Sequence, residues 1–409
     1  MTATVLGGIG LLATCPPDAA AQGEIGLVER AALVWDAAGA VVWTGPEADL
    51  PAAFADAPRQ SARGGLVIPG LVDCHTHLAF AGDRAGEFVA RLRGADYLAQ
   101  ARQGGGIAAT VRATRAATEG DLLESARARL AAMLALGVTT VEAKTGYGLS
   151  LDAEMKTLRV YERLAADGPQ RIVPTLLAAH TVPPEFAHDR AAYVRLVCET
   201  IIPAAAGLAT FCDAFVEQGA FTADEAERVF AAGRAHGLVP KLHADQLSDT
   251  GGAALAARVG AASADHLECV SEAGIAALAA AGTVAVSLPT ATLVLGQEPL
   301  PARRLLDAGV PVAVATDFNP GSAPSPDLHL ALWLACTRQR MTPAEALAGA
   351  TSAAARALGL AGVVGSLTPG ARADLLLLDA PDVDRWLYDF RPGRVRRVAI
   401  GGRTVWPAP

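Results

Sequence analysis

The sequence of 409 residues has few aromatic side chains, 5% in all, and no cluster of lysine and arginine with interleaved aromatics. Its formal net charge is -8 at pH 7. Proteins that bind nucleic acid present basic clusters to the phosphate backbone, so we expect no nucleic-acid partner. The composition instead favours chemistry on small molecules.

Long apolar runs and clustered cysteines are also missing. No uninterrupted apolar run reaches the roughly 20 residues that a membrane helix needs. The apolar stretch near Met1 has no positively charged start and is interrupted from Cys15 to Asp18, unlike a secretory signal peptide. The six cysteines lie far apart without C-x-x-C spacing, which argues against a disulfide framework or a structural zinc knuckle. We therefore expect a cytoplasmic protein without a membrane partner.

Short apolar runs alternate with helical patterns from about residue 64 to residue 360, which is typical of βαβ units and a parallel sheet. Eight runs are predicted to be strands: 66–73, 138–144, a run that ends at His180, 211–217, 238–243, 264–268, 283–288 and 312–317. A doubly wound sheet would more often carry a glycine-rich phosphate loop after its first strand, and none occurs there. The pattern predicts an α/β fold with a TIM-like (β/α)8 barrel.

Both ends of the chain have a different pattern. Residues 24–45 alternate around an Asp-Ala-Ala-Gly turn, and 365–407 repeat this style of short strands and glycine turns. Because neither end is long enough to bury a core alone, we expect both to combine into one small β-sandwich. The predicted domains are 1–63 and 365–409, the two parts of the sandwich, and 64–364, the catalytic barrel.

Four histidines and one aspartate fall at the ends of predicted strands. His75 and His77 lie in PGLVDCHTHL, where the alternation of an extended chain points both imidazoles the same way. His243 closes the fifth strand, His266 lies in the sixth and Asp317 closes the eighth. All these strand ends open on one face of a barrel. Three imidazoles and a carboxylate around one ion would leave a position for water, as in hydrolytic metal sites.

Nitrogen and oxygen ligands of this kind suit zinc, and also iron or manganese. Two-metal barrels often bridge their ions with a carboxylated lysine from the fourth strand, but 211–217 contains no lysine. We therefore predict a single metal ion. Glu217 and Lys144 are expected to be hydrogen-bonding or ion-pair partners near the barrel mouth.

Further polar side chains follow the same strand ends. Arg84 comes one loop after the first strand and could pair with a carboxylate, although a solvated surface arginine fits equally well. Tyr147 follows the second strand, and His180 ends the third as a ligand or a substrate contact. The loop 318–322, Phe-Asn-Pro-Gly-Ser, offers backbone N–H groups that suit an anionic or zwitterionic group, and an ordinary turn has the same composition.

Several of these motifs occur together in one known family. PGLVDCHTHL, GDRAGEF, EAKTGYGLSLDAEMKTL, HTVPPEF, KLHADQLS, SADHLE and TDFNPGSAPS resemble the imidazolonepropionases of the amidohydrolase superfamily. The resemblance runs from about residue 65 to the end of the barrel, and the tail GSLTPGARADLLLLD resembles the superfamily's return into its β-sandwich.

The resemblance implies a role for each candidate. One divalent or trivalent metal ion per subunit, zinc or iron, would be held by His75, His77, His243 and Asp317. His266 would assist catalysis without ligating the metal. Substrate contacts would come from Arg84, Tyr147, His180, Gln246, Asn319, Gly321 and Ser322. The implied reaction hydrolyses the cyclic amide of 4-imidazolone-5-propanoate to N-formimidoyl-L-glutamate in L-histidine catabolism, and the superfamily suggests a homodimer.

Gln246 departs from the family pattern, because some relatives carry a glutamate at this position. A glutamine cannot take a proton, so this side chain is not expected to act as a general base. We therefore expect Asp317 to accept the proton of the attacking water and to return it to the departing ring nitrogen, while His266 stabilises the oxyanion. Two other functions remain open at this point. A related metal-dependent heterocycle deaminase would release ammonia, and a non-catalytic scaffold would be expected to have lost the ligand set.

Overall fold

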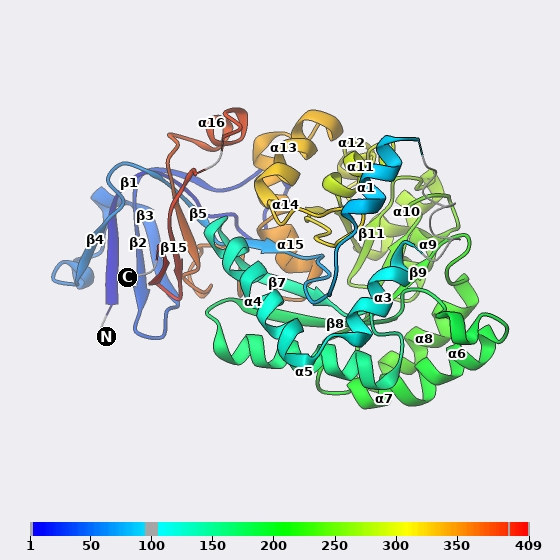
Figure 1. Ribbon diagram of the computed structural model, residues 1–409. Helices are drawn as coiled ribbons and strands as arrows, with labels where there is room; N and C mark the ends of the chain where they lie inside the picture. The colour runs from blue at the N-terminus through cyan, green and yellow to red at the C-terminus, as the bar shows by residue number, and fades with distance from the viewer. Residues whose placement is uncertain (1–2, 95–104, 392, 408–409) are drawn as a thin grey trace.

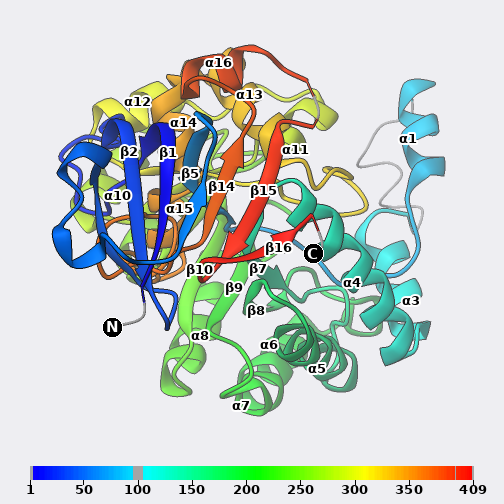
Figure 2. The same ribbon diagram turned by 90° about the vertical axis from the view of Figure 1, so that its left-hand side faces the viewer.

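The computed structural model describes residues 3–94, 105–391 and 393–407. Two eight-stranded sheets organise the chain: one built from both of its ends, called the small sheet because it forms the smaller domain, and a parallel sheet surrounded by helices (Figure 1). Both described ends of the chain belong to the small sheet, where they lie well apart from each other in the view of Figure 2.

The parallel sheet contains eight strands, and strands that are consecutive in the chain are hydrogen-bonded neighbours. They are β6 (Leu71–Asp73), β7 (Val138–Lys144), β8 (Arg171–Ala179), β9 (Phe211–Val216), β10 (Val239–Ala244), β11 (Ser263–His266), β12 (Val284–Ser287) and β13 (Val312–Val314). Its first and last strands meet, since Asp317 N donates to His75 O at 3.1 Å just beyond them. The predicted (β/α)8 barrel is confirmed.

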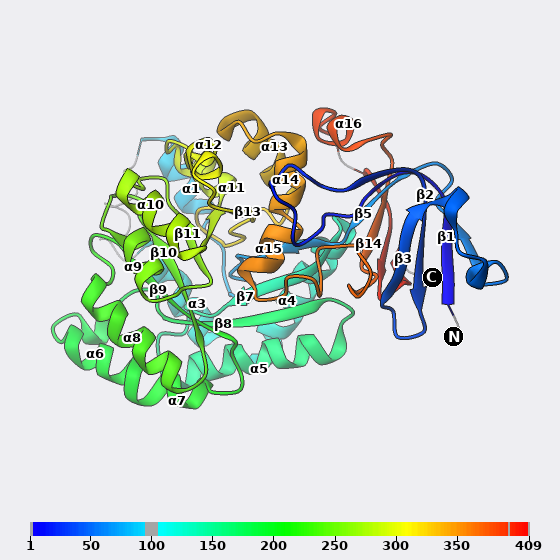
Figure 3. The same cartoon turned by 180° about the vertical axis from the view of Figure 1, so that it is seen from behind.

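Helices enclose the barrel from outside (Figure 3). Those from the first half of the chain are α1 (Ala85–Leu92), α3 (Ile107–Ala116), α4 (Glu119–Ala135), α5 (Leu151–Asp167), α6 (Arg190–Leu196), the π-helical turn η4 (Val197–Ile201) and α7 (Ile202–Ala205). The others are α8 (Ala223–Ala235), α9 (Gly252–Arg258), α10 (Glu272–Ala281), α11 (Pro289–Leu295), α12 (Ala302–Asp307), α13 (Leu328–Gln339), α14 (Pro343–Gly349), α15 (Ser352–Ala357) and α16 (Val383–Tyr388). In the described ranges, no helix combines the length and the apolar character that crossing a membrane requires.

Capping residues fix where several of these helices begin. The side chain of Thr118 accepts a hydrogen bond from Asp121 N, and the Asp121 carboxylate accepts one from Thr118 N, at the start of α4. The same reciprocal pair begins α8 at Thr222 and Glu225. Such pairs satisfy N–H groups that a helix leaves free at its first turn, so the sequence sets these boundaries locally.

The small sheet contains strands from both ends of the chain (Figure 2). They are β1 (Ala3–Ala13), β2 (Leu27–Asp36), β3 (Val41–Pro46), β4 (Arg59–Ser61), β5 (Leu66–Pro69), β14 (Leu375–Leu378), β15 (Val395–Ile400) and β16 (Arg403–Trp406). The apolar run near the start of the chain, not predicted as a strand, is β1. Leu6, Leu33 and Leu375 share a buried core, which confirms that the two ends combine. The boundaries after residues 63 and 364 stay a prediction.

The predicted first barrel strand, 66–73, is divided between the two sheets. β5 pairs with β1 and β14 in the small sheet, and only β6 belongs to the barrel. Gly70 lies at the change of sheet, where a Cβ atom would come within 2.3 Å of Thr139 Oγ1. A glycine is therefore required for this close approach. The apolar pattern did not reveal the division, because both halves of the run are buried.

Leu376 of β14 gives a test of how firmly the small sheet is joined to the barrel. Its side chain is fully buried in the main core, beside Gly137 between α4 and β7. We expect Leu376→Ala to lower the free energy of unfolding by about 2–5 kcal/mol, because it leaves a cavity at this junction. Chemical denaturation followed by circular dichroism measures the change.

Leu27→Ala is the matched control, since Leu27 is 56% exposed at the start of β2. We expect it to change stability by less than about 0.5 kcal/mol. A loss in Leu376→Ala no larger than in this control would mean that the small sheet and the barrel unfold independently.

Candidate metal centre and active site

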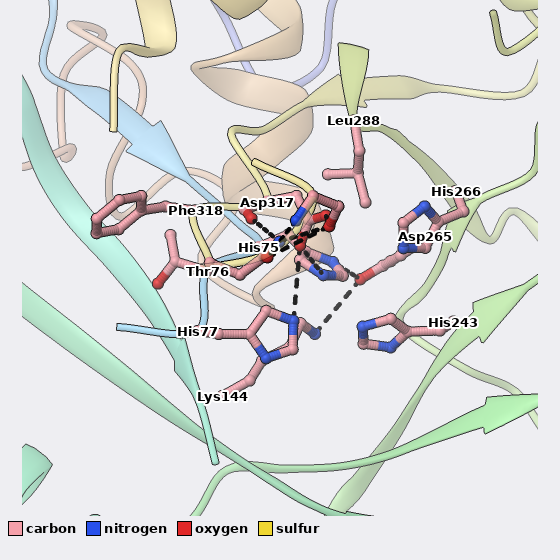
Figure 4. Close-up of polar contacts among 12 residues, drawn as sticks. His75, Thr76, His77, Lys144, His243, Asp265, His266, Leu288, Asp317 and Phe318 are labelled. Carbon is pink, nitrogen blue, oxygen red and sulfur yellow. Dashed lines mark hydrogen bonds and ion pairs between the residues drawn. The ribbon is translucent and has the colours of Figure 1, made fainter. Parts of the chain in front are cut away.

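Three buried histidines converge at the carboxyl ends of the barrel strands. His75 and His77 follow β6, His243 lies in β10, and one ring nitrogen from each lies within 4.8 Å of the others. The described part of the chain contains no other group of this kind. Asp317 Oδ1 lies 3.4 Å from His75 Nε2 and 3.6 Å from His77 Nε2 (Figure 4). The four side chains predicted as ligands are thus brought together.

The ring nitrogens of this cluster fit a cation. His75 Nε2, His77 Nδ1 and His243 Nε2 are buried and have no hydrogen-bond partner among the described residues. Unsatisfied buried polar atoms are costly, and an imidazole lone pair is a good ligand for a transition metal. Burial also lowers the pKa of all three rings well below the usual value, so the rings are neutral and their lone pairs are available.

Two carboxylates hold the other sides of these rings, and sequence reasoning missed both. Asp265 Oδ2 lies 2.6 Å from His75 Nδ1, and Asp213 Oδ1 lies 3.0 Å from His243 Nδ1. A carboxylate oxygen accepts hydrogen bonds, so both contacts favour a proton on Nδ1 and a lone pair on Nε2. The only available signal was a charged residue inside an otherwise apolar strand, in FCDAFV and SADH.

Asp317 and His266 are buried at the same mouth. Burial raises the pKa of Asp317 to about 6. Burial alone would lower the pKa of His266, but the Glu268 carboxylate, 3.7 Å from its Nδ1, outweighs this and raises it. Both residues have a left-handed backbone, with φ of 53° at Asp317 and 79° at His266, a strained conformation common in active sites. The pair thus combines an imidazole whose charged form is favoured by its neighbours with a carboxyl group whose pKa burial raises toward neutrality.

A cavity of about 510 Å³ opens over the cluster. Its volume suits a small molecule. All the side chains predicted to contact substrate or metal line it except His75, which is fully buried, and Gly321. The predicted residues in its wall are His77, Arg84, Tyr147, His180, His243, Gln246, His266, Asp317, Asn319 and Ser322.

Arg84 enters the cavity wall as a buried ion pair. Its Nη2 lies 2.8 Å from Glu87 Oε2, and Glu87 Oε1 also accepts from Gly106 N. The guanidinium packs directly against Gly321, where a Cβ atom would come within 2.0 Å of Nη1. Gly321 therefore leaves the space in which the guanidinium lies. The alternative of a solvated surface arginine is wrong, because the Arg84 side chain is buried.

Tyr147 and His180 lie together in the cavity wall, with 5.5 Å between their ring centroids. His180 Nδ1 donates to Gly146 O at 3.0 Å, and its ring stacks on His77 with 5.3 Å between centroids. Burial lowers the pKa of His180 to about 4, so this ring is neutral. Glu154 holds the loop that carries Tyr147, because its carboxylate accepts hydrogen bonds from the backbone N–H groups of Gly146, Gly148 and Leu149.

The loop that carries Gln246 is held in the same way. Glu217 accepts hydrogen bonds from Leu247 N at 2.8 Å and Ser248 N at 3.2 Å, as its predicted role near the mouth requires. Asp245 accepts from Thr250 N, Gly252 N and Ala253 N. The side chain of Gln246 is left facing the cavity.

Asn319 shapes the loop after β13. Its Oδ1 accepts from Gly321 N and Ser322 N, both at 2.8 Å, and its Nδ2 donates to Asp317 O at 2.6 Å. The amide thus holds Asp317 in place, and Ser322 Oγ lies 3.4 Å from Asp317 Oδ2. Contact of Asn319, Gly321 and Ser322 with a substrate stays a prediction.

Comparison with known proteins places the chain in a family. The model of the amidohydrolase family matches residues 66–405. A protein named imidazolonepropionase from Geobacillus thermodenitrificans is 49% identical over 378 residues, 91% of this chain and 89% of the relative. Another protein of that name, from Paracoccus denitrificans, is 52% identical over 392 residues, 94% of this chain and 96% of the relative.

Solved structures share the fold at lower identity. A zinc-containing mutant of atrazine chlorohydrolase from Arthrobacter aurescens has a TM-score of 0.73 at 20% identity, covering 98% of this chain and 94% of that chain. An adenosine deaminase from Xanthomonas campestris with bound zinc has a TM-score of 0.73 at 21% identity, covering 98% and 92%. Together with the closer sequence relatives, these matches show that the chain belongs to the amidohydrolase family and, within it, to the imidazolonepropionases.

Proposed function

We propose that this protein is an imidazolonepropionase, a hydrolase that opens the ring of 4-imidazolone-5-propanoate to give N-formimidoyl-L-glutamate during L-histidine breakdown. Water adds to the ring carbonyl, the carbonyl C–N bond breaks, and the proton of the water moves to the departing nitrogen. The observation that carries the proposal is the set of three buried imidazoles beside Asp317 at the floor of the cavity. Identity of about 50% with proteins of this name supports the choice of substrate.

The ligand set proposed for one metal ion is His75, His77, His243 and Asp317. When bound, the ion would supply Lewis acidity and lower the pKa of water. The nitrogen and oxygen donors suit zinc or iron, and zinc is favoured because the two related structures contain it. The neutral state of the three rings supports binding without a cost for removing ring protons.

Asp317 and His266 are the proposed catalytic residues. With its pKa raised to about 6, Asp317 is a carboxylate at neutral pH that can still accept a proton from water and pass it to the leaving nitrogen. His266, whose charge Glu268 favours, faces the same cavity and would donate to the developing oxyanion. Gln246 would hydrogen-bond the ring amide, because its side chain offers both a donor and an acceptor.

The propionate arm would lie between Arg84 on one wall and Tyr147 and His180 on the other. The guanidinium supplies a charged, forked donor for a carboxylate. Asn319, Gly321 and Ser322 would complete the pocket on the side of Arg84, where Gly321 leaves room for the guanidinium.

Location and assembly are proposed as well. All six cysteines, in described positions, are free of disulfides, which fits the reducing conditions of the cytoplasm. A homodimer is the proposed assembly, on the family resemblance.

The reaction itself is the first test. We expect metal-loaded protein to remove the ultraviolet absorbance of imidazolonepropionate without releasing ammonia. Asp317→Asn should lower kcat by at least about 100-fold, because an amide cannot take a proton. Asp307→Asn, on the exposed side of α12, is the matched control and should retain full activity. Ammonia release would contradict the proposal and favour a deaminase.

The role of Arg84 can be tested without removing its charge. We expect Gly321→Ala to push the guanidinium out of place and raise KM about tenfold or more, with kcat changed less, because the lost contact orients the propionate rather than the reacting bond. Arg84→Ala should have the same effect, and the double variant should be little worse than either. Additive losses in steady-state kinetics would mean that the two residues act separately.

The pH dependence of metal binding follows from the ligand pKa values. Below about pH 6 Asp317 in the metal-free protein takes up a proton, whereas the three histidines stay neutral. Zinc affinity should therefore be constant above about pH 7 and fall about tenfold per pH unit below pH 6. Competition with a chelator measures this, and Asp317→Asn should abolish the slope. A flat profile in the unmodified protein would contradict the pKa assigned to Asp317.

A further inference from the structure

Five charged side chains lie inside the barrel beneath the histidines, and together they form what we call the interior ionic network. It consists of Glu142 and Lys144 on β7, Asp213 on β9, Lys241 on β10 and Asp265 on β11. All five are fully buried. Three carboxylates and two ammonium groups share this space, so each cation neutralises more than one neighbour.

Lys144 is the central cation of the network. Its Nζ lies 2.7 Å from Asp213 Oδ2 and 2.9 Å from Glu142 Oε1. It also lies 3.4 Å from Asp265 Oδ2 (Figure 4). Asp213 and Asp265 are the two carboxylates that accept the Nδ1 protons of His243 and His75. One lysine therefore contacts the partners of two of the three clustered imidazoles.

Lys241 has a different set of contacts, although it is equally buried. Its Nζ donates to Glu142 Oε2 at 2.7 Å and to Cys74 O at 3.1 Å, and it lies 4.0 Å from Asp265 Oδ2. It therefore makes no hydrogen bond to either carboxylate that holds a histidine. The chain thus offers two buried lysines in one barrel, of which only one hydrogen-bonds these carboxylates.

The state of the carboxylates decides which way each imidazole presents its lone pair. An ionised carboxylate can only accept, so it forces the proton onto Nδ1 and leaves the lone pair on Nε2. Each carboxylate must therefore be held in a fixed place beside its ring. Lys144 Nζ contacts Asp213 Oδ2, while Asp213 Oδ1 faces His243, and it also lies 3.4 Å from Asp265 Oδ2, the atom that faces His75.

We propose that Lys144, Asp213 and Asp265 are positioning residues for the metal centre, with Lys144 holding both carboxylates where they accept the Nδ1 protons of His75 and His243, so that each ring offers Nε2 to the metal. The inference rests on the proposed metal site but not on the identity of the substrate. Glu142 links Lys241 to Lys144, and Lys241 hydrogen-bonds neither carboxylate that holds a histidine, although its Nζ lies 4.0 Å from Asp265 Oδ2.

Zinc affinity of the metal-stripped full-length protein is the main test, measured by competition with a chromophoric chelator. We expect Asp265→Asn, Asp213→Asn and Lys144→Met each to weaken zinc binding by about 10–100-fold, the usual effect of losing a partner of a ligand histidine. Lys241→Met makes the same chemical change in the same barrel and should weaken it much less.

A second control separates positioning from general loss of stability. Asp374 is a buried carboxylate of the small-sheet region that bonds to Arg372 Nε at 2.9 Å and Gly401 N at 2.7 Å, far along the chain from the barrel. Asp374→Asn should lower the melting temperature of the metal-free protein and leave zinc affinity unchanged. In the network variants the rise in melting temperature on adding zinc should shrink as well.

The unmodified protein gives a test that does not depend on any network variant folding. Nitrogen-15 spectra of its histidine rings, without metal, should show His75 and His243 as the Nδ1–H tautomer, assigned by the signals missing in His75→Gln and His243→Gln. The Nε2–H tautomer in either ring, or unchanged zinc affinity in folded Lys144→Met, would overturn the proposal. Weakened zinc binding in a protein that does not hydrolyse imidazolonepropionate would instead refute only the proposed function.

Discussion

A buried imidazole can ligate a metal only if one nitrogen is held as a donor and the other is kept free, and the architecture of this site follows from that requirement. Asp265 and Asp213 hold the Nδ1 atoms of His75 and His243. Buried carboxylates need cations, and Lys144 supplies one that contacts both. The parallel barrel makes this possible because β9, β10 and β11 are neighbours, only β8 separates β9 from β7, and all four strands project alternate side chains into one interior.

The cost of this arrangement is a barrel interior that is ionic where such barrels are usually filled with branched apolar side chains. Buried ion pairs contribute little net stability, because the loss of hydration offsets much of their attraction. The stability of the chain must therefore come from the apolar contacts between the strands and the outer helices, where Leu122, Leu158 and Phe230 are buried. The charged side chains of the proposed site thus lie inside the barrel, whereas the apolar packing that stabilises the fold lies between the strands and the outer helices.

The sequence was sufficient to predict the barrel and the ligand cluster because both depend on local patterns. His75, His243 and Asp317 each follow an apolar run, and parallel topology brings such ends together. Asp213 and Asp265 were not predicted, since a single acid in a strand gives no sign of which histidine it will face. The division at Gly70 was equally hidden, because strand partners in different sheets are set by contacts far apart in sequence.

Gln246 lies in one of the cavity loops whose backbone is held by buried carboxylates. The loops on both sides of the cavity are tied by buried carboxylates: Glu154 beneath Tyr147, and Asp245 and Glu217 beside Gln246. These carboxylates accept hydrogen bonds from several backbone N–H groups of each loop. The loop backbone is therefore fixed by the fold, and it sets where the side chains that face the cavity begin. In the proposed mechanism the neutral amide at position 246 serves in recognition, while proton transfer and oxyanion stabilisation are assigned to Asp317 and His266, whose pKa values burial and Glu268 raise. Recognition and proton transfer would then depend on side chains from different strand ends, position 246 after β10 and position 317 after β13.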